Sequence, residues 1–151
     1  MEFEQLKLDN QLCFPVYVAS RLIIREYQPF LDKLGITYPQ YLVLMVLWES
    51  DNISVNQISK RLILNTNTIT PLLKRMETMG LIKRTRSDRD ERKVIVKLTQ
   101  KGKDMRIEAA EIPEQLAICL SEKTMTLEGL IELKKSLNIL ISALLGKNKS
   151  E

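Results

Sequence analysis

The sequence contains no histidine, and this absence removes several classes of function at once. Without imidazole the chain has no histidine general base, no histidine metal ligand and no histidine pH switch. It has only two cysteines, Cys13 and Cys119, which are too few for the usual four-ligand zinc site. We therefore expect no metal, no cofactor and no hydrolase or metalloenzyme activity.

Long apolar runs are missing as well. No stretch approaches membrane-spanning length, and the N-terminus is acidic and polar, unlike a secretory signal. These features predict a soluble, cytoplasmic protein with no membrane partner, and a reducing compartment disfavours a purely structural disulfide.

What the chain does contain is enough apolar material for a core. With 151 residues, 44% of them hydrophobic, it fits a single domain spanning 1–151. The net charge of +4 suits a polyanionic partner and suits an ordinary surface equally well.

Three short helices are marked by their starting residues. Thr37-Tyr38-Pro39-Gln40 and Ser54-Val55-Asn56-Gln57 are capping boxes, in which a hydroxyl and an amide side chain cap the first turn reciprocally. Asn65 is a third candidate N-cap. The pattern predicts helices at about 37–50, 54–62 and 65–79.

Longer amphipathic segments flank these helices. One covers about 9–34 and ends at Gly35; another begins after Thr99 and should bend at Pro113; a last helix carries leucines at alternating three- and four-residue steps. The segments 9–34 and 99–146 have more apolar surface than a small domain needs, so we predict that they form a homodimer. The alternative is that they only cover their own domain.

The segment 65–79 has two different faces. Its apolar side contains Ile69, Leu73 and Met76, whereas its other side is short, polar and cationic. After Gly80, the segments 81–86 and 93–98 flank a charged tip at 87–92, which predicts a β-hairpin. The expected fold class is mainly α with a small β-hairpin wing, a winged helix-turn-helix covering about 37–98.

This pattern suits double-stranded DNA. Short polar residues at the start of a helix can approach base edges in the major groove, and arginines of a wing can enter a narrow, A·T-rich minor groove. Two copies would require a palindromic operator, and Asp90 should orient Arg92. The alternative for the hairpin is a solvated charged turn. The candidate DNA-contacting residues are Thr66, Asn67, Thr68, Thr70, Lys74, Arg75, Arg84, Arg86, Arg89, Asp90 and Arg92.

Several stretches resemble one known family. The run 64–92, the lead-in 36–41 and the start 10–14 are similar to the MarR family of winged-helix repressors, in the organic hydroperoxide resistance branch. The more specific parts are the segment 68–77 and the tip Asp90-Glu91-Arg92, and the resemblance spans nearly the whole chain.

The resemblance implies that Cys13 is a thiol that senses organic peroxide. Tyr17 lies four residues further on, and Tyr27 and Tyr38 would reach the sulfur from the partner subunit. By similarity to a two-cysteine subgroup, Cys119 of the other subunit would capture the sulfenic acid of Cys13 as a disulfide, and DNA would be released. The alternative for either cysteine is an inert apolar residue.

Two departures from the family pattern bear on these roles. Pro15 stands where relatives carry a leucine-like residue, so either the first helix begins near Pro15 or it is kinked there. Asn65 and Asn67 replace more familiar acidic and glycine residues, so the preferred operator can differ. Two further functions remain open: a regulator that binds a small phenolic ligand while its cysteines are passive, and a thiol peroxidase.

Overall fold

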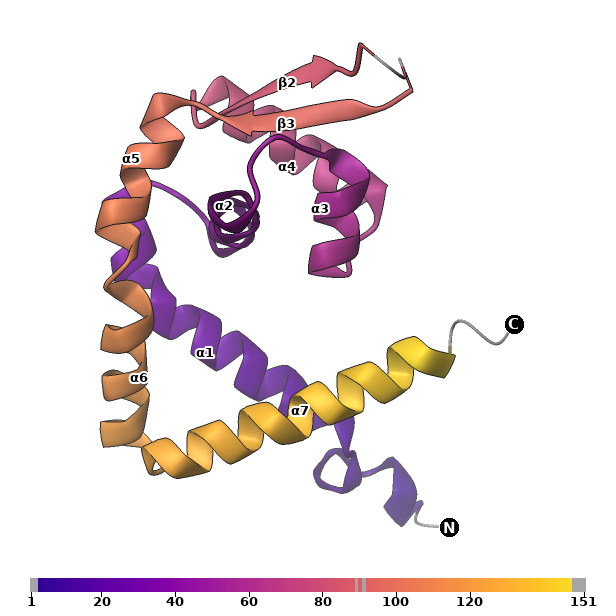
Figure 1. The fold of residues 1–151 in the computed structure, drawn as a ribbon. Helices are drawn as coiled ribbons and strands as arrows, with labels where there is room; N and C mark the ends of the chain where they lie inside the picture. The colour runs from indigo at the N-terminus through magenta and orange to yellow at the C-terminus, as the bar shows by residue number, and fades with distance from the viewer. Residues whose placement is uncertain (1–2, 89, 91, 148–151) are drawn as a thin grey trace. The chain divides into compact units, whose positions relative to one another are not determined.

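The computed structural model describes residues 3–88, 90 and 92–147, and it divides the chain into two compact units. The first unit, Met1–Ala110, contains helices α1 to α5 and a three-stranded sheet. The second unit, Glu111–Glu151, contains α6 and α7. Figure 1 shows the order of these elements along the chain. The predicted fold class, mainly α with a small β wing, is confirmed.

Helix α1 (Cys13–Leu34) begins later than the sequence predicted, because two short 3-10 helices, η1 (Glu4–Leu6) and η2 (Leu8–Asn10), precede it. Pro15 therefore lies in the first turn, where its missing N–H has no intrahelical partner to lose. Of the two possibilities raised by Pro15, the first is right. Gly35 ends the helix as predicted, with φ of 65° in the left-handed region. The helix also runs through Pro29, which the sequence pattern did not mark.

The next three helices follow the predicted starts closely. They are α2 (Tyr38–Glu49), α3 (Val55–Leu62) and α4 (Thr66–Thr78). Both predicted capping boxes form: the Thr37 N–H donates to Gln40 Oε1 at 2.8 Å, and the Ser54 N–H donates to Gln57 Oε1 at 2.9 Å. These local signals succeeded because each involves atoms only three residues apart.

The sheet has one more strand than the predicted hairpin. Strands β2 (Ile82–Arg86) and β3 (Val94–Leu98) form the hairpin, and a two-residue strand β1 (Ile53–Ser54) pairs with the other side of β3. The order is β1-β3-β2, all antiparallel, so β2 lies at an edge. The core of the first unit consists of apolar side chains from its helices and sheet. Its most buried members include Leu31, Tyr41, Leu44, Leu47, Ile58, Ile69, Leu73, Met76, Leu81, Ile82 and Val96.

Helix α5 (Gln100–Ala109) is held against the sheet by a close backbone approach. Thr99 caps it by accepting from the Gly102 N–H at 3.1 Å. The carbonyl of Gly102 accepts from Trp48 Nε1 at 2.8 Å, and a Cβ on Gly102 would collide with the Leu81 carbonyl oxygen. Position 102 therefore requires glycine.

The second unit corrects one prediction. We expected one helix bent at Pro113, but α5 ends at Ala109 and α6 (Ile112–Lys123) begins anew. Proline is compatible with the first turn of a helix and costly in its interior, so Pro113 starts a helix instead of bending one. Helix α7 (Leu127–Lys147) follows. Within the described parts of the chain, no helix has the length and apolar character needed to cross a membrane.

Candidate nucleic-acid interface and cysteine sites

Helix α4 has the two faces that the sequence predicted. Ile69, Leu73 and Met76 are buried, and their helix packs against α3 and β2. The exposed residues on its other side are Thr66, Asn67, Thr68, Lys74 and Arg75. Thr70 differs from them, because it is half-buried and its hydroxyl donates to the Thr66 carbonyl at 2.8 Å. The exposed side chains at the start of α4 are thus available for an external polar partner.

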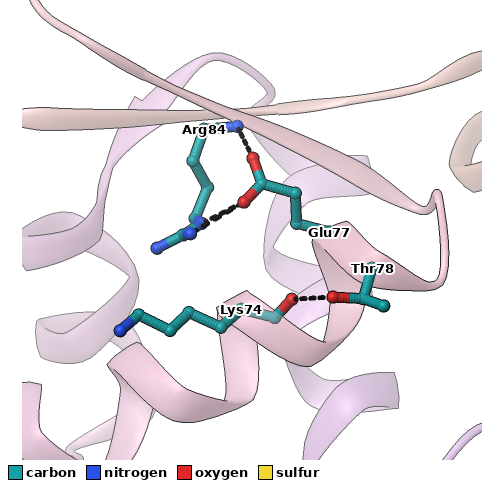
Figure 2. A network of polar contacts seen from close by, with 4 residues as sticks. All are labelled: Lys74, Glu77, Thr78 and Arg84. Carbon is teal, nitrogen blue, oxygen red and sulfur yellow. Dashed lines mark hydrogen bonds and ion pairs between the residues drawn. The ribbon is translucent and has the colours of Figure 1, made fainter.

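The β2–β3 hairpin, here called the wing, is fixed to α4 by an ion pair. Arg84 donates to the Glu77 carboxylate from its backbone N–H at 2.9 Å, from Nε at 3.0 Å and from Nη2 at 2.7 Å. Figure 2 shows the Glu77 side chain extending from α4 to the strand that carries Arg84. The hydrogen bonds from the Arg84 side chain, followed by the one from its backbone, hold the pKa of the Glu77 carboxyl below its usual range. Arg84, predicted only as a DNA contact, is therefore also a structural residue.

Asp90 shapes the turn at the tip of the wing. Its carboxylate accepts from the Arg92 backbone N–H at 3.1 Å and lies 3.7 Å from Lys93 Nζ. The expected contact of Asp90 with Arg92 therefore runs through the backbone of Arg92. Arg86 and Arg92 are exposed, whereas Arg89 and Glu91 lie outside the described residues.

A hollow lies between the wing and the helix pair α3–α4. Three cationic side chains, Arg84, Arg92 and Lys93, line it together with Thr66 and Thr70. Its remaining lining residues are Ser54, Val55, Asn56, Leu73 and Val94. Cations that converge in this way attract anionic groups such as phosphates. Lys93 was not among the predicted site residues, although its position beside the tip arginines was a signal for it.

Cys13 is the first residue of α1 and is exposed. Tyr17, one turn further along, is also exposed, and the guanidinium carbon of Arg21 lies 5.4 Å from its ring centroid. The geometry thus places a thiol, a phenol and a cation along the first three turns of one helix.

Tyr27 and Tyr38 lie side by side within the same chain. Their ring centroids are 4.9 Å apart, and Tyr41 and Trp48 extend the aromatic cluster. Burial, with contributions from Tyr38 and Tyr41, raises the pKa of Tyr27 to about 12. Burial also raises the pKa of Tyr38, and the hydrogen bond with Tyr27 opposes this rise.

Cys119 lies in α6 and is partly exposed. Ile112 and Leu116, which precede it in the same helix, are buried. Cys119 belongs to the second unit and Cys13 to the first.

Comparisons with known proteins agree with this arrangement of a helix pair and a wing. Residues 25–108 match the family described as transcriptional regulator SarA/Rot. The organic hydroperoxide resistance transcriptional regulator of Bacillus subtilis (strain 168) is 45% identical over 147 residues, which cover 97% of this chain and 98% of that relative.

Solved structures of a second regulator are also similar. Reduced AbfR bound to DNA matches with a TM-score of 0.77 and 37% identity, covering 96% of this chain and 99% of that one. A disulfide-formed AbfR matches with a TM-score of 0.58 and 40% identity, covering 91% and 95%. These relatives define a class of winged-helix transcriptional regulators. The chain belongs to the MarR and SarA/Rot family of such regulators, in the branch of the organic hydroperoxide resistance regulators.

Proposed function

We propose that this protein is a redox-sensing transcriptional repressor that binds a palindromic operator as a homodimer and leaves it when organic peroxide oxidises Cys13. The observation that carries the proposal is an exposed cysteine at the N-terminus of α1, in a chain that is 45% identical to an organic hydroperoxide resistance regulator. The protein acts as a regulator and not as an enzyme, and it works on DNA in the cytoplasm.

DNA recognition follows from α4 and the wing. The major groove admits a helix, and Thr66, Asn67 and Thr68 are short enough to approach base edges closely. Lys74 and Arg75 contact phosphate or guanine, and Arg86 and Arg92 of the wing reach a narrow A·T-rich minor groove. In a two-fold dimer the two α4 helices lie one turn of DNA apart, which requires a palindrome. That AbfR has been solved in complex with DNA supports this role.

The sensing step is an oxygen transfer to sulfur. The Cys13 thiolate attacks one peroxide oxygen, the O–O bond breaks, and the products after proton transfer are a sulfenic acid and an alcohol. Tyr17 of the same chain and Tyr38 of the partner subunit donate hydrogen bonds to the sulfur. Tyr27, whose ring centroid lies 4.9 Å from that of Tyr38, packs against the Tyr38 phenol and restricts its orientation.

The second step uses Cys119 of the partner subunit. Its thiol condenses with the sulfenic acid, a disulfide forms and water leaves. The two Cα atoms must then come within about 4.4 to 6.8 Å, which moves the terminal helices and changes the spacing of the two α4 helices. The existence of a disulfide-formed AbfR supports this step.

Titration with cumene hydroperoxide, followed by operator binding on the same samples, tests the proposal. Cys13→Ser should keep operator affinity and ignore the oxidant. Cys119→Ser should still oxidise at Cys13 but lose the disulfide-linked dimer band on a non-reducing gel. Peptide mass mapping identifies the oxidised residues.

The same titration separates the other candidate functions. Unchanged operator affinity after full oxidation of Cys13 would contradict redox sensing and favour a regulator that binds a phenolic ligand. Sustained peroxide consumption with an added reductant would instead indicate a thiol peroxidase.

A further inference from the structure

The contact between Glu77 and Arg84 joins the two parts of the proposed DNA-binding surface. Glu77 lies in the last turns of α4, and Arg84 lies in the middle of β2. One carboxylate oxygen accepts from the Arg84 backbone N–H, and the other accepts from Nε and Nη2 of its guanidinium. A single acidic side chain therefore fixes both the backbone and the side chain of one wing residue (Figure 2).

The backbone hydrogen bond from Arg84 to Glu77 lies on the edge of β2 that faces away from β3. Among the described residues, strand β2 pairs only with β3, so alternate N–H groups of β2 point away from the sheet. The Arg84 N–H is one of these, and Glu77 accepts its hydrogen bond. The wing is thus attached to α4 along its open edge.

This ion pair is better shielded than the other described pairs of the first unit. The Arg84 and Glu77 side chains are 22% and 37% exposed, whereas those of the pair Arg61–Glu49 are 61% and 62% exposed. Exposed pairs contribute little, but charge-assisted hydrogen bonds with fixed geometry are among the strong ones. Glu77 therefore constrains the angle between the wing and α4.

Simple electrostatics makes the opposite prediction for DNA binding. A carboxylate beside a surface that meets phosphates should weaken binding, so its removal should help. However, Arg84 also lines the hollow that contains Arg92 and Lys93, and its guanidinium has five N–H groups, more than one carboxylate can occupy. The carboxylate determines where those groups point.

We propose that Glu77 is a positioning residue for operator binding: by holding the backbone and guanidinium of Arg84, it sets the wing against the recognition helix and aims Arg84 at a DNA phosphate. This inference rests on the proposed function, because it presupposes that α4 and the wing bind an operator.

The operator affinity of the Glu77→Gln variant tests the proposal. The proposal predicts weaker binding, whereas simple electrostatics predicts tighter binding. Glutamine has the same shape and removes one negative charge, but its amide nitrogen cannot accept from the guanidinium. We expect affinity to fall roughly tenfold, as the loss of charge-assisted hydrogen bonds implies. Arg84→Lys keeps the positive charge without the planar fork, and it should cause a similar fall.

Two control variants remove a carboxylate elsewhere. Asp88→Asn neutralises an exposed acid of the wing tip and should leave affinity equal or higher. Glu49→Gln breaks the exposed α2–α3 ion pair and should leave affinity unchanged. Equal or tighter binding by Glu77→Gln would overturn the proposal, as would an equal loss in all three variants. Circular dichroism of each variant verifies that the fold persists.

A second measurement needs no DNA. Amide hydrogen exchange of the wild-type protein should show the Arg84 backbone N–H protected, and Glu77→Ala should abolish that protection. The N–H groups of Lys83 and Thr85 alternate toward β3 and should stay protected in both proteins. Rapid exchange of the Arg84 N–H in the wild type would disprove the attachment. If the wild type bound no duplex while this protection held, the proposed function would fail and the attachment would stand.

Discussion

The winged-helix head, residues 38–98, and helix α7 use the same apolar residue types in opposite ways. In the head, Ile69, Leu73 and Met76 of α4 are buried. In α7, the leucines Leu133, Leu140 and Leu144 are between 39% and 53% exposed, and none of the residues whose burial is described is buried. The apolar side chains of the head are buried within the head itself, whereas the leucines of α7 form an apolar stripe that stays exposed.

Helix α1 contains both behaviours within one element. Near its C-terminal end Leu31 is fully buried, and α1 contacts α2 and α5. At its start, the exposed fractions are 87% for Leu12 and 47% for Val16. The apolar pattern of a helix therefore predicts which side chains become buried. It does not predict whether the same chain or a second copy covers them. The exposed apolar residues agree with the proposed homodimer, in which α7 and the first turns of α1 contact a second copy.

The largest expected effect comes from making the α7 stripe polar. Leu133→Glu combined with Leu140→Glu should weaken dimerisation by roughly a hundredfold or more, because each subunit would lose two buried leucines at the interface. Operator binding should be lost with it. Analytical ultracentrifugation measures the dimerisation constant.

The control for this double variant is an exposed apolar residue of the head. Ile63→Asn should leave the dimer intact, since Ile63 lies between α3 and α4. A fully dimeric double variant would show that α7 covers only its own chain.

The next effect compares one substitution in the two regions. Gly102→Ala should destabilise the protein by about 3 kcal/mol, because the new methyl group would collide with the Leu81 carbonyl and crowd Leu98. Gly129→Ala in α7 meets only ordinary contacts and should stabilise it by about 0.5 to 1 kcal/mol. Chemical denaturation of both variants measures the two values, and equal signs would contradict the comparison.

The head was largely predictable because its signals are local. Capping boxes, a helix with one apolar face, and a turn between two β-rich segments each involve residues close in sequence. The starts of α2, α3 and α4 therefore agreed with their expected positions to within a residue.

The features that were missed depend on pairing across the chain. Strand β1 is two residues long and exists only because Ile53 and Ser54 pair with β3. Glu77 lies in the segment 68–77 that resembles the family, but the sequence assigned it no role. Its contact with Arg84 is seen only in the folded structure and cannot be inferred from their spacing. For the cysteines, the resemblance implied a sensing role for Cys13 and a pairing with Cys119, and both stay predictions.

The aromatic cluster offers a smaller, pH-dependent test of how firmly α1 is joined to the head. The pKa of Tyr27 is raised to about 12, so in the folded state this phenol stays protonated while the unfolded chain ionises near 10. The contribution of Tyr27 to the free energy of unfolding is therefore fully present below about pH 10. It is lost as the pH rises to about 12, by on the order of 1 kcal/mol at pH 11.

Tyr27→Phe should make the decline between pH 10 and 12 shallower, as measured by denaturation at several pH values. Tyr17→Phe, which alters an exposed phenol, is the control and should leave the slope unchanged. An identical slope for Tyr27→Phe and the wild type would mean that Tyr27 ionises alike in both states.

The smallest expected effect concerns the turn between α3 and α4. Ile63 ends α3 in the left-handed region with φ of 55°, although β-branched residues are rarely found there, and its side chain is 57% exposed. The conformation costs an L-residue about 1 to 2 kcal/mol, and glycine avoids this cost but loses more entropy on folding. Ile63→Gly should therefore stabilise the head by about 0.5 to 1 kcal/mol in thermal unfolding, with α7 and dimerisation unaffected. A lower melting temperature would mean that the Ile63 side chain buries apolar surface against a neighbouring residue, and that this contact outweighs the cost of the left-handed conformation.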